Sequence, residues 1–145
     1  MAGTFKLEVA VPDRLLIETE AESLRAPAVG GSLGVLPGHA PLLTEIGVGV
    51  LSYKADGRTR YVSLNGGVME IQPECVRLLA NTAEWAEEVD VKRAEVSLRR
   101  AMDILRNHDM SINVERAQAA VARAQTRLDA WKQAGKPARQ APPEE

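Results

Sequence analysis

The sequence has few of the residues that carry disulfide, metal and thiol chemistry. It contains one cysteine and two histidines in 145 residues, so it offers no internal disulfide and no Cys/His cluster with the spacing of a zinc or iron site. The cysteine, Cys75, stands in a strand-like run, where we expect a small buried hydrophobic residue rather than a reactive thiol. A single cysteine also fits a reducing compartment.

Aromatic residues and long apolar runs are scarce too. Only 3% of the residues are aromatic, so the core has to come from the aliphatic part of a hydrophobic fraction of 45%. No apolar run approaches the ~20 residues that a membrane-spanning helix needs, and the N-terminus lacks the pattern of a secretory signal. The net charge of −2 gives no basic surface for nucleic acid. We expect a soluble or peripheral protein without a nucleic-acid partner.

Motifs of a self-sufficient enzyme are missing from the sequence. It has no P-loop and no G-x-G-x-x-G fingerprint. Ser32 and His39 are close in sequence, but they lie outside the G-x-S-x-G context that would make the serine a nucleophile. The sequence therefore predicts no catalytic residue and no metal ligand.

The first part of the chain contains a series of short β-patterns separated by turns. Residues 5–9 alternate between apolar and polar side chains, as a half-buried strand does. Asp56-Gly57 predicts a tight hairpin turn, and residues 65–67 (Asn-Gly-Gly) are expected to form another corner. Turn signals spaced about 8–12 residues apart are typical of a β-sandwich or a flattened barrel. We assign one of these two folds to residues 1–86.

The last third of the chain carries two ladders of small and apolar residues with alternating spacings of three and four. The ladders are Val91, Ala94, Leu98, Ala101 and Leu105, followed by Val114, Ala117, Val121, Ala124, Leu128 and Trp131. This spacing places each set on one stripe of a helix, and the alanines let two helices approach closely. With Asp90 and Asn113 (or Ser111) as N-caps, the pattern predicts an antiparallel helical hairpin over residues 87–134. Residues 135–145 are expected to form a disordered tail.

The predicted hairpin has few large apolar residues for its length. Because alanine contributes little buried area, we expect the hairpin to lean on the β-sandwich, on a partner or on a ligand. An element of such marginal stability can be moved by whatever binds it. Two interpretations stay open, a mobile hairpin and a static hairpin packed permanently on the sandwich.

Five arginines are spaced so that they line one flank of the predicted hairpin. They are Arg93, Arg100, Arg116, Arg123 and Arg127. Clustered like charges repel unless they are solvated or surround an anion. The flank therefore fits either an ordinary solvated basic face or an anion site.

One segment of the sequence resembles a known family closely. Residues 31–43 read Gly-Ser-Leu-Gly-Val-Leu-Pro-Gly-His-Ala-Pro-Leu-Leu, which is similar to the G-x-L-G-x-L-P-G-H-A-P-L-L segment of the epsilon subunits of bacterial F-type ATP synthases. Residues 65–71, residues 78–84 and the Ala-rich hairpin agree in the same order, so the resemblance covers about residues 4–132. It implies an α+β fold, with an N-terminal antiparallel β-sandwich of about ten strands followed by a C-terminal antiparallel two-helix hairpin.

The resemblance also implies a role and its partners. The sandwich of such a subunit binds the gamma subunit and rests on the c-ring, with which it turns during proton-driven ATP synthesis. The hairpin either folds on the sandwich or extends into the alpha/beta head, where it restrains ATP hydrolysis. The chain would then be non-catalytic, monomeric in isolation, and peripheral at the cytoplasmic face of the bacterial inner membrane. An ATP-sensing regulatory protein and a generic coiled-coil adaptor are the alternatives.

Some bacterial members of this family bind ATP on the folded hairpin through an I/L-D-x-x-R-A motif. Residues 89–94 read Val-Asp-Val-Lys-Arg-Ala here, with valine in place of the usual isoleucine or leucine. The resemblance thus implies a regulatory ATP site, while no cofactor is required. The residues that it assigns to this site are Glu84, Val89, Asp90, Arg93, Ala94, Arg100, Arg123 and Arg127.

Overall fold

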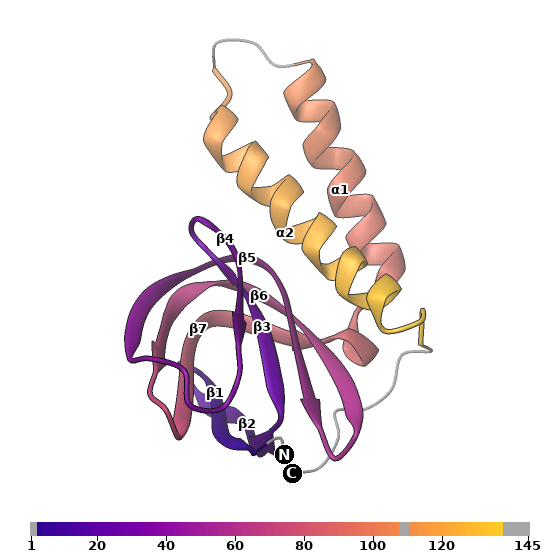
Figure 1. The fold of residues 1–145 in the computed structure, drawn as a ribbon. Helices are drawn as coiled ribbons and strands as arrows, with labels where there is room; N and C mark the ends of the chain where they lie inside the picture. Colours follow the sequence, from indigo (N-terminus) through magenta and orange to yellow (C-terminus); the bar gives the residue numbers. More distant parts are fainter. Residues whose placement is uncertain (1–2, 108–110, 138–145) are drawn as a thin grey trace.

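The computed structural model describes residues 3–107 and 111–137. Over these residues the chain forms a β-sandwich followed by a two-helix hairpin (Figure 1), so the predicted fold class is confirmed. A short 3-10 helix, η1 (Ala86–Glu88), leads from the strands into α1 (Val91–Arg106) and α2 (Val114–Gln133). The strands are β1 (Phe5–Val11), β2 (Arg14–Ala21), β3 (Ser23–Ala28), β4 (Gly31–Val35), β5 (Leu42–Ala55), β6 (Arg58–Ile71) and β7 (Cys75–Trp85).

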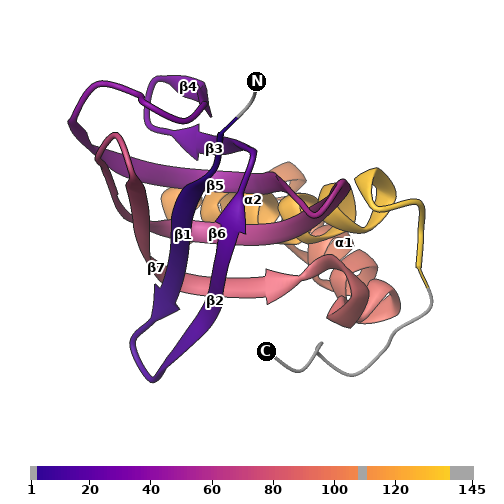
Figure 2. The same ribbon diagram turned by 60° about the horizontal axis from the view of Figure 1, so that its bottom comes forward.

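One hydrogen-bonded sheet builds the sandwich. Its strand order is β2-β1-β7-β6-β5-β3-β4, and neighbouring strands are antiparallel except β1 and β7, which pair in parallel. β5 and β6 are 14 residues long, which is enough to bend from one layer into the other. The β1–β2 hairpin crosses over them in Figure 2. The sheet therefore folds back on itself, and the core lies between its two layers.

The described residues form seven strands, fewer than the sequence predicts. The number is lower because some of the predicted short strands are joined into single longer strands. β6 continues through residues 65–67, where the sequence predicts a corner, so that expectation is wrong. Gly66 and Gly67 have φ angles of 70° and 127°, which bend β6 while its pairing with β5 and β7 continues on both sides. A Cβ at Gly67 would overlap the Leu79 carbonyl oxygen, so only glycine lets β6 come this close to β7.

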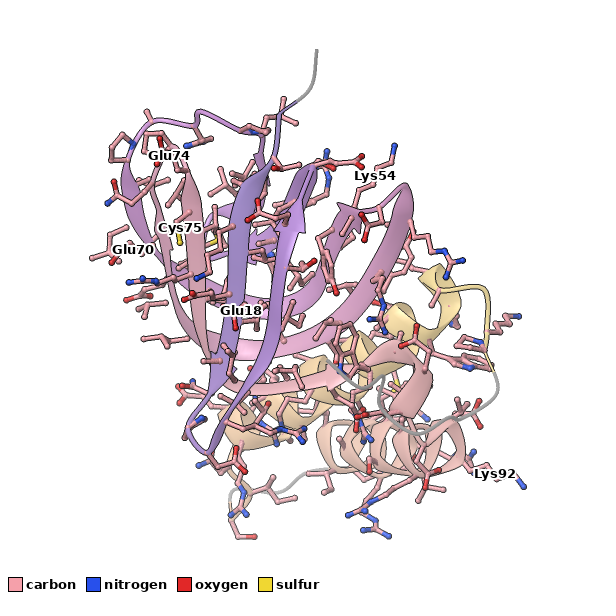
Figure 3. All side chains as sticks on the ribbon, turned by 90° about the horizontal axis from the view of Figure 1, so that it is seen from below. Glu18, Lys54, Glu70, Glu74, Cys75 and Lys92 are labelled. Carbon is pink, nitrogen blue, oxygen red and sulfur yellow. The ribbon has the colours of Figure 1, made fainter. Side chains whose placement is uncertain are left out.

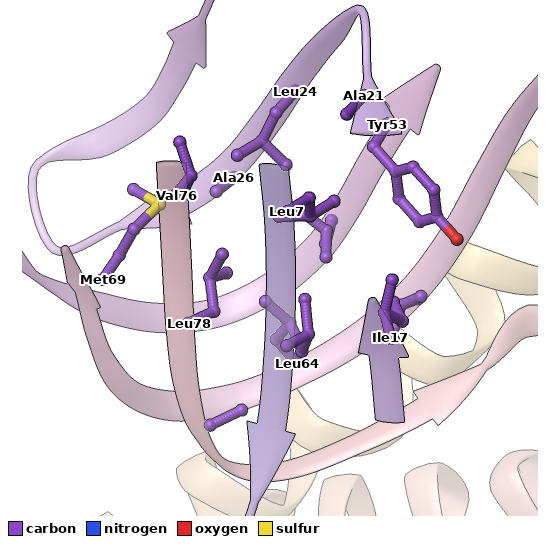
Figure 4. Packing of buried hydrophobic residues seen from close by; sticks show 14 of the residues in the cluster. Leu7, Ile17, Ala21, Leu24, Ala26, Tyr53, Leu64, Met69, Val76 and Leu78 are labelled. Carbon is purple, nitrogen blue, oxygen red and sulfur yellow. The ribbon is translucent and has the colours of Figure 1, made fainter. Parts of the chain in front are cut away.

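The core of the sandwich is mainly aliphatic, as the scarcity of aromatic residues requires. Its largest fully buried side chains include Phe5, Leu7, Leu51, Leu64, Met69, Ile71 and Leu78, several of which appear in Figure 4. Buried and more exposed side chains alternate along most of β1 and β7, so every second side chain of these strands contributes to the core. The sandwich therefore has a continuous apolar interior of its own.

Charged side chains cover the outside of the molecule (Figure 3). Cys75, predicted to be buried, lies half-buried at the start of β7, beside Glu74. The alternation of β7 is the reason, because Val76 and Leu78 take the inward positions next to it. The residue is a free cysteine.

Both helices begin where the sequence predicts. The Asp90 carboxylate accepts a hydrogen bond from the backbone N–H of Arg93 at 3.1 Å. The Asn113 side chain accepts one from the backbone N–H of Arg116 at 3.0 Å. Each cap satisfies a donor that the helix itself leaves unpaired. No helix within the described ranges is long and apolar enough to cross a membrane.

A Schellman turn ends α2. Gly135 adopts a φ of 82°, and the backbone N–H of Lys136 donates to the Trp131 carbonyl oxygen at 2.9 Å. The indole Nε1–H of Trp131 in turn donates to the Pro137 carbonyl oxygen at 2.9 Å. The first three residues of the predicted tail thus form the helix-ending turn, and residues 138–145 lie outside the described part of the chain.

The two predicted ladders form the seam of the hairpin. Its buried rungs are Ala94, Ala101, Ala117, Ala124 and Leu128. The larger rungs of α1, such as Leu98 and Leu105, are only half-buried. α2 lies against β5 and β6, and α1 packs on α2 (Figure 1). The hairpin therefore leans on the sandwich through one helix, as its small core leads us to expect.

Candidate functional site

An ion pair joins α2 to the end of β7. The Arg127 Nε lies 2.8 Å from Oε1 of Glu84, and its Nη2 lies 3.2 Å from Oε2, so the guanidinium contacts both carboxylate oxygens. This fork geometry fixes the position of α2 along the sheet. The two side chains are 27% and 30% exposed, so solvent or a ligand can reach them.

A hollow of about 210 Å³ surrounds this pair, between α2 and the sheet. Its lining includes the polar residues Ser63, Asn65 and Thr82 from the strands and Arg123 and Thr126 from α2, together with Leu64 and Ala83. Ser63 and Thr126 are buried. When polar groups of this kind lose their protein contacts, they form hydrogen bonds to water instead, so the net free-energy cost of separating them is small. At this point α2 meets the sheet through an ion pair and polar side chains as well as apolar ones.

The motif at residues 89–94 contributes mainly to structure. Val89 is 2% exposed and Ala94 is fully buried, so both are packing residues. The Asp90 carboxylate is used as the N-cap of α1. Arg93 is the exposed member of the motif, and its side chain can reach a ligand.

Three of the five arginines of the predicted flank lie beside two different hollows. Arg123 and Arg127 line the hollow next to Glu84. Arg100 lines a shallow groove on α1 together with Val96. Of the predicted site residues, the structure therefore brings Glu84, Arg123 and Arg127 together and positions Arg100 in another place.

The polar residues that complete the hollow are missed by the sequence reasoning. Thr126 and Ala130 are buried four residues apart on α2, on a stripe outside the main ladder. This stripe of small residues is a signal in the sequence for a second packing face of the helix. Ser63 carries no such signal, because only the pairing of β6 with β7 brings it opposite Glu84.

A second candidate surface lies on the outer face of the sandwich. Leu79 on β7 lies opposite Val68 on β6 and opposite Ala10 on β1, and Ala10 lies opposite Leu15 on β2. Leu15, Val68 and Leu79 are 42%, 41% and 59% exposed. We call Ala10, Leu15, Val68 and Leu79 together the apolar row. Exposed apolar side chains that are contiguous in this way mark an interaction surface.

Paired charges flank the apolar row. Glu8, two residues before Ala10 on β1, accepts contacts from the Lys6 Nζ and the Arg77 Nε, both at 3.0 Å. Lys6 also lies 3.3 Å from Glu18. The hydrogen bond from Lys6 is the main cause that lowers the pKa of Glu8, and Glu8 in turn raises the pKa of Lys6. The charges beside the row are therefore already compensated within the sandwich.

Known proteins resemble this chain over most of its length. Residues 4–86 match the family described as ATP synthase, Delta/Epsilon chain, beta-sandwich domain, and residues 87–132 match its long alpha-helix domain. The ATP synthase epsilon chain of Solibacter usitatus is 43% identical over 128 residues, which are 88% of this chain and 96% of the relative. The epsilon chain of Bacillus licheniformis is 36% identical over 126 residues, which are 87% and 96% of the two chains.

A solved structure shares the fold at lower sequence identity. It is a chain of the mitochondrial ATP synthase of Euglena gracilis, in a cryo-EM structure of OSCP/F1/c-ring in rotational state 1. The TM-score is 0.78, the identity is 18%, and the match covers 88% of this chain and 81% of that chain. The sandwich and the hairpin thus recur together in the same arrangement.

Proposed function

This chain belongs to the delta/epsilon chain family of ATP synthases, and we propose that, as an epsilon subunit of the F-type enzyme, it links the gamma subunit to the c-ring in the central stalk during ATP synthesis. In this proposal the subunit is itself non-catalytic. It is monomeric in isolation and peripheral at the cytoplasmic face of the bacterial inner membrane, where its partners hold it. The observation that carries the proposal is the apolar row, an exposed surface on a rigid base.

The apolar row is the proposed contact with the gamma subunit. It crosses four neighbouring strands of a well-packed sheet, so its shape is set before binding and little ordering is lost on association. Leu79 is its most exposed member and the natural centre of the contact. The paired charges next to the row would form the polar rim that such interfaces have.

Co-elution of the full chain with the gamma subunit tests this contact. We expect Leu79→Asp to weaken the complex by roughly 30-fold or more, as loss of a central apolar anchor does. Leu36→Asp is the matched control, because Leu36 is 65% exposed but lies outside the apolar row. Equal binding by both variants and the unaltered chain would rule out the apolar row as the gamma contact.

The hairpin is the proposed regulatory element. α2 meets the sheet through the Glu84–Arg127 pair, a polar hollow and small buried residues, whereas the sandwich has an apolar core. An interface of this composition separates at a lower free-energy cost than the core. We propose that the hairpin leaves the sandwich, extends into the alpha/beta head and restrains ATP hydrolysis there.

A chain that ends at Asp90 tests this role in the assembled enzyme. Ending there keeps every residue of the core cluster of the sandwich, which runs from Phe5 to Trp85, so the sandwich retains its packing. We expect ATP hydrolysis to rise while binding to the gamma subunit stays unchanged. A generic coiled-coil adaptor predicts instead that hydrolysis is unaltered by the truncation, and that result would refute the regulatory role.

Regulatory ATP is proposed to act at the hollow beside Glu84. Arg123 and Arg127 have the chemistry for phosphate, and Arg93 is exposed at the start of α1. The hollow, at about 210 Å³, is smaller than the ~300–1,000 Å³ of typical small-molecule pockets. A bound nucleotide would therefore have to draw Arg127 away from Glu84. Binding of the nucleotide would then change how α2 packs on the sheet.

Calorimetry with ATP on the isolated full chain tests the nucleotide site. We expect Arg127→Ala and Arg93→Ala to lower the affinity by roughly 10-fold each, the usual loss for a charged hydrogen bond. Arg106→Ala, at the far end of α1, is the control and should bind as the unaltered chain does. A free-standing ATP sensor predicts the same loss together with no binding to the gamma subunit. Unchanged affinity in both site variants would remove the proposed pocket.

A further inference from the structure

The short helix η1 connects the end of the sandwich to the start of the hairpin. β7 ends at Trp85, which is also the last residue of the core cluster of the sandwich. η1 follows directly and contacts both β6 and α2 (Figure 1). If the hairpin leaves the sandwich, the chain has to turn either before η1 or after it. The contacts that η1 makes therefore decide where the hinge lies.

Arg60 on β6 joins η1 to the sandwich through two contacts. Its guanidinium lies over the Trp85 ring, 3.8 Å from the centroid, and its Nη2 lies 3.9 Å from Oε2 of Glu87, in the middle of η1. Two other carboxylates, those of Glu18 and Asp56, line the cavity of about 500 Å³ beside Arg60. Within the described residues, Arg60 nevertheless makes its ion contact with the carboxylate of η1.

The partial burial of these groups makes the Arg60 contacts matter for η1. Trp85 is 3% exposed, and a cation on an aromatic face is attracted more strongly where water is largely excluded. Oε2 of Glu87 is buried and accepts no hydrogen bond from the described residues. Its contact with Arg60 therefore offsets the loss of water around this oxygen. Because the stack fixes the guanidinium on Trp85, the guanidinium is in place to hold Glu87.

Two extended residues, Val89 and Asp90, separate η1 from α1. Their ψ angles are 124° and 94°, and they belong to neither helix. The Val89 N–H donates to the Ala86 carbonyl oxygen within η1, and the Asp90 side chain caps α1. Rotation about ψ of Val89 and φ of Asp90 leaves both of these hydrogen bonds intact. Residues at the ends of elements often act as hinges for this reason.

We propose that η1 stays on the sandwich when the hairpin leaves, that Arg60 is the positioning residue that holds it there, and that the chain turns between Val89 and Asp90. The hairpin then extends from a fixed root, and the sandwich sets the direction in which it extends. The effect of this hinge on ATP hydrolysis rests on the proposed regulatory role of the hairpin. The seating of η1 is a property of the sandwich itself and does not depend on that role.

Nitrogen-15 relaxation of a chain that ends at Glu95 tests the position of the hinge. This chain retains the whole core cluster of the sandwich, and its five residues of α1 are too few to form a stable helix. We expect backbone order parameters of about 0.85 at Glu87 and Glu88, as in a rigid strand, and below about 0.6 at Lys92. Values below about 0.6 from Ala86 onward would show that η1 needs the hairpin to stay ordered, and the proposal would be overturned.

Two substitutions in the same shortened chain test the role of Arg60. Arg60→Gln removes both contacts, whereas Glu87→Gln removes the ion contact alone, and we expect each to lower the order parameters of η1 below about 0.6. Arg58→Gln is the matched control, because Arg58 lines the same cavity two residues earlier on β6 and makes no ion contact within the described residues. Unchanged order in either variant would contradict the proposal. Glu87→Gln alone gives the test if Arg60→Gln perturbs the sheet.

ATP hydrolysis by the assembled enzyme tests what the fixed root does. The full chain with Arg60→Gln should restrain hydrolysis several-fold less than the unaltered chain, because a hairpin on a loose root no longer extends in one direction. The full chain with Arg58→Gln should restrain it as the unaltered chain does. Full restraint by the Arg60→Gln chain would show that Arg60 does not position the hairpin. A failure of the regulatory role itself would appear separately, as hydrolysis that is unaltered in a chain ending at Asp90.

Discussion

The sandwich and the hairpin of this chain are stabilised in different ways. The sandwich buries large side chains such as Leu51, Leu64 and Met69 between two layers of one sheet. Apart from Leu128, the buried apolar residues of the two helices are alanines. Because buried area sets the size of the hydrophobic contribution, most of the stability lies in the sandwich. The comparison shows how one chain can combine a rigid base with an arm that is easily displaced.

The contact between the two parts follows the same division. α2 rests on the sheet with one fork-shaped ion pair, a polar hollow and small residues. Because the buried side chains of α2 are small apart from Leu128, we expect the cost of release to stay well below that of unfolding the sandwich. Four variants and conditions test this division, from the largest expected effect to the smallest.

The largest effect is expected for a truncation in the sandwich core. Leu64 is 1% exposed, and Leu64→Ala should lower the free energy of unfolding by about 2–5 kcal/mol. Leu98 on α1 is half-buried, so Leu98→Ala should cost clearly less. Urea unfolding of both variants measures the difference. Equal losses would mean that the hairpin is as well packed as the sandwich.

The bend of β6 at Gly67 gives the next prediction. Gly67→Ala places a Cβ against β7 at a φ of 127°, and we expect a loss of more than ~1 kcal/mol in the free energy of unfolding. Gly30→Ala is the control, because a Cβ at Gly30 meets open space. Thermal unfolding compares the two variants. A Gly67 variant as stable as the control would show that the strand can relax without loss.

A smaller effect is expected at the junction between the two parts. Arg127→Ala should loosen α2 by about 1 kcal/mol or less, since the pair with Glu84 is about a third exposed. Hydrogen exchange should then accelerate in α2 and α1 while the sheet amides keep their protection. Arg106→Ala, which removes a 3.9 Å contact with Asp103 on an exposed surface, should change neither. A uniform acceleration of hydrogen exchange over the whole chain would contradict the conclusion that the sandwich and the hairpin are stabilised separately.

The smallest effect concerns pH and the charges beside the apolar row. The pKa of Glu8 is lowered from its ordinary 4.5, chiefly by the hydrogen bond from Lys6. Its contribution to stability is therefore complete above pH 4.5 and is lost as the pH falls through the lower pKa of the folded state. Glu8→Gln should flatten this part of the pH dependence of unfolding. Glu95→Gln on α1 should leave the curve unchanged, and a flattening there as well would refute the assignment.

Part of the candidate site could be predicted from the sequence. The spacing of the ladders predicts both helices, and the caps Asp90 and Asn113 follow from residue type. The resemblance singled out Glu84 and Arg127, which the structure brings into one ion pair. Arg100 lies at another groove, because the spacing of the arginines fixes their angles around each helix but not how α2 is turned toward the sheet.

The sequence by itself determined the local elements, since helix periodicity, capping residues and turn dipeptides act over a few neighbouring positions. Only the tertiary structure decided that β6 bends at Gly67 instead of ending there, because the close approach of β7 comes from a distant part of the chain. It also decided that Leu15, Ala10, Leu79 and Val68 form one surface. These residues are far apart in sequence, and the pairing of four strands is what aligns them.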